Sequence, residues 1–425
     1  MSIASTLRES FSPLRIRNFR IYLGGQAISL VGTWLQMTAQ SWVVWELSRS
    51  ATALGVAAML GSLPILLLGP WAGVWADRLD RRKLLIATQA GAMLFAFVLA
   101  FLTQTGLVQL WHVYVLAALL GIITAVDIPA QQTFLGDLAG MAEIRKAINL
   151  NITMLQVSRI LGPALAGIII ASLGAATAFW LNGLSFIAVI ISLWLLTSNQ
   201  VRKPHSGNFL AEFKEGVSYV GTQPRVQDLI ILAILVTFFA FPVIMSLLPA
   251  VVGKVLRGDA ATLSWLMMSS GAGALVGTMF LAPLAQAMRR TGLVLGGTIG
   301  WVGLWLILFS ETSWLPLSLV SLFFVSMGIP TVLTTTMGLM QILAPADMRA
   351  RLMSLFFTLS FGMQPFASLL AGYTADTLTT PMAIRVNGVL LLFGAALIMA
   401  VRPALRRWEA NAAAHQPAPV AIDPV

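Results

Sequence analysis

The chain of 425 residues is 58% hydrophobic and only 10% charged, whereas about a quarter of the residues in an ordinary soluble domain are charged. This composition excludes such a domain and predicts a polytopic membrane protein. Lys and Arg outnumber Asp and Glu by 26 to 16, but these cations collect in the short loops of one face. The excess therefore indicates orientation and contact with membrane lipids, with no nucleic acid as a partner.

Twelve apolar segments follow one another along the chain. Each is long enough to cross a hydrocarbon core of roughly 30 Å as an α-helix. Charged residues, Gly, Pro or short polar turns separate the segments. The expected spans are 19–46, 52–76, 83–103, 110–134, 146–171, 176–197, 226–250, 261–287, 292–310, 315–341, 352–374 and 383–401. We therefore predict an all-α membrane protein with twelve transmembrane helices.

The longest polar stretch divides these spans into two sets of six. We expect an N-terminal bundle at 1–197, a cytoplasmic linker at 198–225, a C-terminal bundle at 226–405 and a disordered cytoplasmic tail at 406–425. Part of the linker, 209–220, is amphipathic, and it either lies on the inner membrane surface or serves as a plain tether. An even number of spans and the cation-rich loops predict a multi-pass protein of the cell inner membrane, with both termini cytoplasmic.

A charged turn joins the second and third spans. Gly73 permits close approach of a neighbouring helix. Asp77, at a helix end, suits the positive N-terminus of another helix, and Arg81 can bridge to an acid. A turn that only orients the chain is the alternative. The residues of this gating motif are Gly73, Asp77, Arg78, Arg81, Arg82 and Lys83.

The spacing of this turn resembles the loop between spans two and three of the major facilitator superfamily, although Asp80 stands where that family usually has Gly. The resemblance implies two pseudo-symmetric six-helix bundles and transport by alternating access. Looser patterns along the chain are similar to the enterobactin exporters and macrolide-type efflux proteins. They are Asp127 to Pro129, Phe134 to Asp137, Arg159 before Gly162 and Pro163, Asn182 to Phe186, and Pro345 to Arg351.

Arg159 lies near the middle of the fifth span. A lipid-facing Arg at this depth costs at least about 2.5 kcal/mol, so we expect Arg159 to face the bundle interior, an acid or a water-filled cavity. It is a candidate central charge for coupling, and an ion pair needed only for folding is the alternative. Gly162, Pro163 and Gly167 follow it and resemble a fifth-span motif of exporters, in which Gly allows close packing and Pro allows a bend.

Asp127 lies within the fourth span, and two roles compete for it. It accepts Arg81 as a latch on the inner face, or it pairs with Arg159 and exchanges a proton. Depth favours the latch, because Arg159 lies deeper in the membrane than Asp127. The fourth-span Arg motif of proton antiporters is absent from this sequence.

Further polar or aromatic side chains within the spans are candidates for a substrate cavity. Any of them can instead hydrogen-bond between helices. The surrounding Met and Phe residues favour a bulky amphipathic substrate. The candidates are Trp34, Gln36, Gln40, Asn182, Thr335 and Gln364.

The predicted function is secondary active export of small amphipathic molecules, either siderophores or drug-like compounds, with protons as the coupling ion in an antiport cycle. An importer or lipid flippase of the same superfamily, or a membrane scaffold that does not transport, are the alternatives. The scattered His residues, the missing Cys and the missing Walker A sequence predict no metal, no cofactor and no enzyme activity. We expect a monomer.

Overall fold

The computed structural model describes residues 11–196, 209–288, 290–345 and 348–406. The side chains of 70, 73–78, 141, 209–213, 350 and 404 are not among the described parts, and the predicted tail from 407 lies outside them. Every regular element in the described residues is helical. This agrees with the predicted all-α class.

The first half of the chain forms five long helices after a short 3₁₀ turn, η1 (Ser12–Arg15). Gly140 (φ 70°) bends α5 sharply, so that this element carries both the fourth and the fifth expected spans. The helices are α2 (Arg17–Ser48), α3 (Ala51–Arg78), α4 (Arg81–Gln104), α5 (Leu110–Leu173) and α6 (Ala175–Trp194).

The second half begins with α7 (Phe209–Thr222) and α8 (Pro224–Phe239). The seventh and eighth spans each pass through π-helical turns, and the eleventh is divided at Met363 between two helices. The remaining elements are η2 (Val243–Leu247), α9 (Leu248–Ala250), η3 (Val251–Leu256), α10 (Ala260–Val276), η4 (Gly277–Leu281), α11 (Ala282–Ala287), α12 (Thr291–Glu311), α13 (Leu315–Leu343), α14 (Arg349–Gly362), α15 (Gln364–Thr377), α16 (Thr380–Val401) and α17 (Pro403–Arg406).

Local capping explains where two of these helices start. Asp80 adopts an extended conformation and its carboxylate accepts the backbone N–H of Lys83, so the residue that replaces the family's usual Gly is the N-cap of α4. Asp259 caps α10 in the same way. The backbone N–H and the hydroxyl of Thr262 both donate to Asp259, and these bonds hold the pKa of the Asp259 carboxyl below its usual range.

Eleven helices in the described residues are long and apolar enough to cross a membrane. The first expected span lies in α2, a helix of 32 residues that is not among the eleven. Gln26, Gln36, Gln40 and several Ser and Thr residues lower the mean hydropathy of α2. The exact number of twelve therefore stays a prediction, whereas the helical membrane fold is confirmed.

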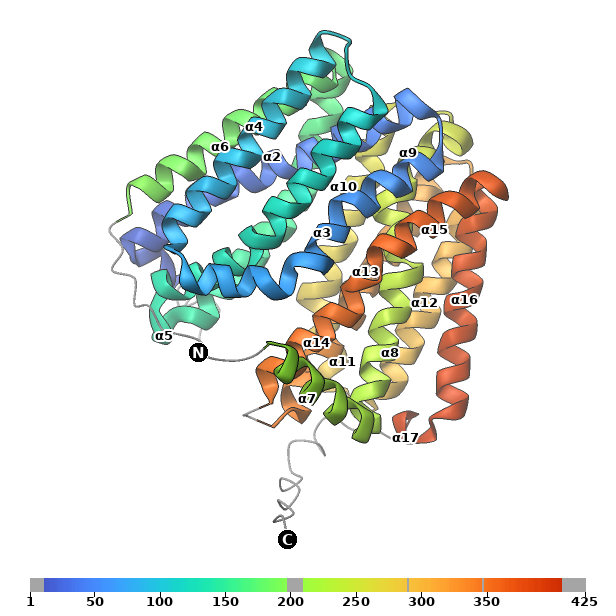
Figure 1. Cartoon of the computed structure of the whole chain (residues 1–425). Coiled ribbons are helices and arrows are strands. Elements are labelled where there is room, and N and C mark those ends of the chain that lie inside the picture. The colour runs from blue at the N-terminus through green and yellow to red at the C-terminus, as the bar shows by residue number, and fades with distance from the viewer. Residues whose placement is uncertain (1–10, 197–208, 289, 346–347, 407–425) are drawn as a thin grey trace.

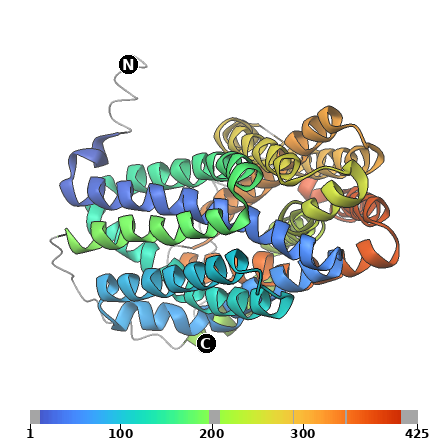
Figure 2. The ribbon, with the colours of Figure 1, turned by 90° about the horizontal axis from the view of Figure 1, so that it is seen from above.

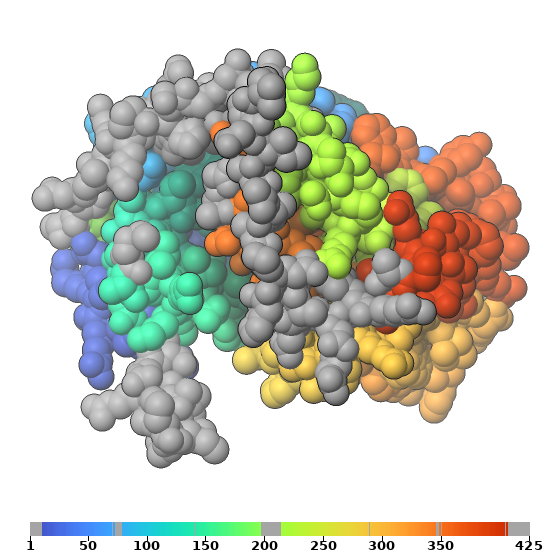
Figure 3. Space-filling model, turned by 90° about the horizontal axis from the view of Figure 1, so that it is seen from below, coloured from blue at the N-terminus to red at the C-terminus, as the bar shows by residue number. Residues whose placement is uncertain are grey.

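The helices form two groups that follow the order of the chain. Figure 1 shows α2, α4 and α6 together on one side and α8, α12 and α16 on the other, and Figure 2 shows the same division from above. The groups meet where α3 packs on α15 and where α5 packs on α10. In Figure 3, seen from below, the first and second halves occupy opposite sides of the molecule.

The described part of the linker segment forms the helix α7 as far as Thr222, and α7 docks on α8 and α14 of the second half. Tyr219 and Val220 pack against a small buried cluster that contains Met348 and Leu352. Arg351 of α14 also forms an ion pair with Glu215 of α7, at 2.6 Å. These contacts fix α7 to α14, which a plain tether would not do.

Candidate functional site

The charged turn between α3 and α4 is held by contacts within the first half. Arg81 forms an ion pair with Asp137 of α5, with 2.7 Å between Nη1 and Oδ2. Arg82 donates to the backbone carbonyl of Trp194, 2.6 Å away, in the last turn of α6, where a helix end carries partial negative charge. Gly73, Asp77 and Arg78 lie in α3, and their side chains fall outside the described parts.

The predicted latch between Arg81 and Asp127 is wrong for this conformation. Asp137 follows Asp127 by ten residues in the same helix, which places it about 15 Å nearer the bend at Gly140. Asp137 therefore reaches the depth of the charged turn, and Asp127 stays within the bundle. Asp127 and Arg159 are both described, and they form no ion pair with each other either.

Asp127 instead lies at the centre of a network of neutral donors. Thr88 Oγ1 donates to Oδ1 at 2.6 Å, and the amide of Gln89 donates to both carboxylate oxygens at 3.1 and 3.2 Å. The Gln131 amide donates to Oδ2, and the Gln26 amide of α2 donates in turn to Gln131. The network joins α2, α4 and α5, and it can hold a negative charge without a neighbouring cation.

Arg159 occupies the place where the two halves meet. It lies near the middle of the candidate span Ala142–Leu173, and its Nη2 donates to Ser270 Oγ of α10 at 3.4 Å. Its guanidinium carbon lies 5.6 Å from the centre of the Trp34 ring of α2, which is within range of a cation–π interaction. Ser270 also accepts the hydroxyl of Ser326, at 2.8 Å. Arg159 thus faces protein groups from both halves.

Close helix packing surrounds Arg159. A β-carbon added at Gly162 would overlap the β-carbon of Trp34, and one added at Gly167 would lie 2.7 Å from the β-carbon of Ser264. Pro163 lies within the continuous helix between them. The two Gly residues therefore allow α5 to approach α2 on one side and α10 on the other.

Three of the proposed cavity residues are buried inside the bundles. The Asn182 amide donates to Gln36 Oε1 at 2.7 Å, and their side chains join α6 to α2. Thr335 is fully buried and its hydroxyl donates to the carbonyl of Ala282. These three side chains are buried in this conformation, and their place in a substrate cavity stays a prediction. Trp34, Gln40 and Gln364 remain partly exposed.

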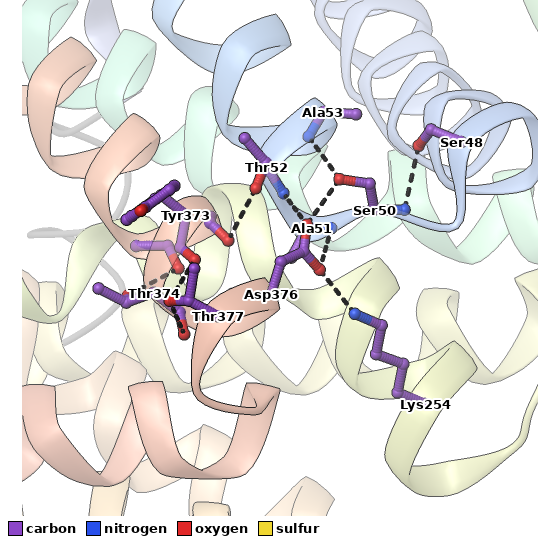
Figure 4. A network of polar contacts seen from close by, with 12 residues as sticks. Ser48, Ser50, Ala51, Thr52, Ala53, Lys254, Tyr373, Thr374, Asp376 and Thr377 are labelled. Atoms are coloured by element: carbon purple, nitrogen blue, oxygen red, sulfur yellow. Dashed lines mark hydrogen bonds and ion pairs between the residues drawn. The ribbon is translucent and has the colours of Figure 1, made fainter.

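Figure 4 shows a polar network around Asp376 that was not predicted from the sequence. The network lies at the start of α3, whereas the charged turn follows the other end of that helix. Asp376, in the last turn of α15, accepts the backbone N–H groups of Ala51 and Thr52 at 3.0 and 2.8 Å. It also accepts the hydroxyl of Ser50 and pairs with Lys254 of η3, each at 2.6 Å. The second half thereby caps the N-terminus of α3 in the first half.

Two signals in the sequence could have pointed to this network. A carboxylate in the last turn of a helix opposes the helix dipole, so Asp376 needs a partner outside α15. The start of α3 at Ser50, Ala51 and Thr52 offers free N–H groups. Nothing in the sequence brings these segments together, because more than 300 residues separate them.

Trp45 of α2 packs against η3 beside the Asp376 network. A β-carbon at Gly253 would overlap the indole of Trp45, so η3 packs directly on this ring. Lys254 Nζ lies 5.7 Å and the Arg49 guanidinium 5.9 Å from the ring centre. The halves are therefore joined at this end by an ion pair, a helix cap and an aromatic contact.

The fold and the charges within it define a polytopic transporter built from two groups of membrane helices. The family model described as "Transmembrane secretion effector", a branch of the major facilitator superfamily, matches residues 8–423, and the chain belongs to this family. The resemblance inferred from the charged turn and from the efflux-type patterns is confirmed.

Proteins similar to this chain carry names that describe transport. The chain is 26% identical to the multidrug efflux pump Tap of Mycolicibacterium fortuitum, over 81% of this chain and 86% of Tap. It is 24% identical to the staphyloferrin A transporter of Staphylococcus aureus, over 65% of this chain and 68% of the relative.

Solved structures agree in fold. The POT family transporter PepTSo matches 93% of this chain and 99% of its own, with a TM-score of 0.72 and 14% identity. A bacterial homologue of the lysosomal transporter Spinster, in an inward-facing and unoccupied conformation, matches the same shares with a TM-score of 0.69 and 15% identity.

Proposed function

We propose that the chain is a secondary active exporter of small amphipathic molecules, siderophores or drug-like compounds, that works by alternating access. Arg159 carries this proposal. Arg159 lies at membrane depth between Trp34 of one half and Ser270 of the other. A charge at this depth costs free energy, so we take its place between the halves as a sign of a role in transport. The efflux and siderophore names of relatives that match most of this chain support the substrate class.

Alternating access requires that the halves separate at one end while they close at the other. The network of Asp376, Lys254 and the start of α3 joins the halves at the end opposite the charged turn. We assign this network the role of an outer gate. The Arg81–Asp137 pair lies within one half, so it stiffens the charged turn and can stay formed while the halves move.

Protons are the proposed coupling ion, and Asp127 is the proposed carrier. A carboxylate surrounded by Thr88, Gln89 and Gln131 can lose or gain a proton without a bound cation leaving. Glutamine amides can rotate to donate to the charged form or to accept from the protonated form. The network therefore tolerates both states of the carboxyl group.

The proposed topology follows the positive-inside rule. The chain lies in the cell inner membrane as a monomer with both termini cytoplasmic. It comprises an N-terminal bundle at 1–197, a linker at 198–225, a C-terminal bundle at 226–405 and a cytoplasmic tail beyond. Its partners are the substrate, membrane lipids and protons.

Transport into oriented vesicles tests the proposal. An exporter accumulates a radiolabelled macrolide or a carboxylate siderophore in inside-out vesicles, against its gradient, when the vesicle interior is acidified. An importer would accumulate the same compound only in right-side-out vesicles. A flippase would move a labelled lipid but neither compound, and a scaffold would move none of them.

A further inference from the structure

We infer that Arg159, Trp34 and Ser270 form a binding site for an anionic oxygen group, such as a carboxylate, on the amphipathic cargo. This inference rests on the proposed function, and it adds that the cargo carries a negative charge.

Arg159 has more donors than partners. A guanidinium group has five N–H donors, and the described contacts of Arg159 are one hydrogen bond to Ser270 and the face of the Trp34 ring. No Asp or Glu among the described side chains forms an ion pair with it. The positive charge is therefore not neutralised within the described part of the chain.

The unused donors of Arg159 are not fully buried. Fully buried side-chain nitrogen and oxygen atoms without a hydrogen-bond partner include atoms of Gln26, Gln89 and Trp305, but no nitrogen of Arg159. The side chain is half-buried. Its unpaired nitrogens are consequently reachable, whereas packed protein fixes the rest of the residue.

The neighbours hold the guanidinium in place. Ser270 is buried, and its hydroxyl oxygen accepts both Arg159 and Ser326, which fixes one edge of the group. Trp34 covers one face, and Gly162 brings the two helices into close contact beside it. A planar group held at one edge and one face offers its remaining N–H groups in a fork that matches a carboxylate.

An organic anion with an apolar body suits this position better than a neutral compound. Its carboxylate can accept from Arg159, and its apolar part can lie along the partly exposed Trp34 ring. The cargo charge then supplies the counter-ion that the chain itself does not supply among its described residues. Trp34 and Ser270 act as positioning residues.

A matched pair of probes tests the inference by equilibrium binding to the purified full-length chain. 1-Pyrenebutyrate and 1-pyrenebutanol share one apolar body and differ in the carboxylate. We expect the wild-type chain to bind the carboxylate at least about tenfold more tightly, because a hydrogen bond to a charged group is worth about that factor or more. Arg159→Gln should reduce the ratio to near one. Arg159→Lys should give an intermediate ratio, because it keeps the positive charge but loses the planar fork.

Arg49→Gln is the matched control. It removes a cation that also lies over a Trp ring, that of Trp45, at the end of the molecule that carries Asp376. This variant should leave the binding ratio unchanged. Equal binding of both probes by the wild-type chain would overturn the inference, and this comparison needs no variant to fold. A ratio that survives in Arg159→Gln would overturn it as well.

Competition identifies the source of the anion. Phosphatidylglycerol in nanodiscs should displace pyrenebutyrate no better than phosphatidylcholine does, and millimolar chloride should not displace it. Displacement by either would assign the site to a lipid headgroup or to an inorganic ion and would overturn the inference. If the chain prefers the carboxylate probe but shows no vesicle transport, the export function is refuted and the anion site stands. If it transports but shows no such preference, the anion site is refuted and the export function stands.

Discussion

Asp127 and Arg159 are two ionisable residues at membrane depth, and their surroundings differ. Asp127 is enclosed by neutral donors from α4 and α5 inside the first half, whereas Arg159 lies between the halves with most of its donors unused. Asp127 lies about 15 Å along α5 from Asp137, the residue that pairs with Arg81, and this separation explains why Asp127 does not meet Arg81. A fixed carboxylate and a reachable cation fit separate roles in proton coupling and in cargo binding.

Replacement of Asp127 by Asn tests the coupling role. The Gln89 and Gln131 amides can rotate to match the new side chain, so the bundle should fold and bind cargo as before. Stimulation of transport by a proton gradient should disappear, because the residue at 127 no longer titrates. Vesicle uptake at several internal pH values measures this, with Asp137→Asn as the control that removes a carboxylate of the charged turn. A full pH response in the Asp127 variant would exclude this carrier.

Helix contacts depend on a few small residues. Gly162 of α5 and Gly253 of η3 each face an indole-bearing residue of α2, so the position of α2 is set from both halves. The sequence indicated close packing at Gly162 from the pattern of Gly and Pro alone. It gave no indication for Gly253, because the partner of a Gly in a π-helical turn depends on the tertiary structure.

Gly162→Ala should destabilise the chain by about 1–3 kcal/mol, because the added carbon overlaps Trp34 and lies 2.9 Å from the carbonyl oxygen of Val31. Gly24→Ala is the control in α2, where no atom lies within 4 Å of the added carbon. It should be neutral or slightly stabilising. Thermal unfolding of both purified variants measures the difference, and equal melting temperatures would show that α5 and α2 do not pack as described.

Asp376 of α15 caps the N-terminus of α3, and this contact between the two halves can be broken by one substitution. Asp376→Asn removes the charge that holds Lys254 and the N-terminus of α3, so the outer end should open more often, by about tenfold if one charged hydrogen bond is lost. Labelling of Gln40→Cys by an impermeant maleimide on intact cells should accelerate accordingly.

Glu311→Gln is the matched control for this opening. It breaks the ion pair with Arg385, which joins α12 to α16 within the second half. Because that pair does not connect the halves, the labelling rate should not change. Equal acceleration in both variants would mean that any lost surface ion pair loosens this end, and Asp376 would have no special role.

For the whole molecule, the sequence predicted the class, the approximate spans and the depth of Arg159, since these follow from hydropathy and helix rise. It did not predict which polar residues pair. Gln36 and Asn182 satisfy each other across 146 residues, and the bend at Gly140 brings Asp137 to Arg81 in place of Asp127. Such pairs depend on helix rotation and kinks, which hydropathy does not encode.

The absence of Cys from the sequence makes topology directly testable, because each introduced Cys is the only one in the chain. Lys83→Cys lies at the charged turn and Thr105→Cys lies after α4, and both positions are exposed. The positive-inside rule predicts that impermeant maleimide labels Thr105→Cys on intact cells and Lys83→Cys only after permeabilisation. The reverse pattern would invert the molecule and the transport direction.

Alternating access is the central claim, and paired spin labels test it most directly. Cys pairs at Glu46 and Leu378 report the end with the Asp376 network, and pairs at Lys83 and Arg349 report the end with the charged turn; all four positions are exposed. Double electron–electron resonance, with and without pyrenebutyrate and across pH, gives both distances. We predict reciprocal changes, in which one distance lengthens as the other shortens. Distances that stay constant, or that lengthen together, would contradict the account.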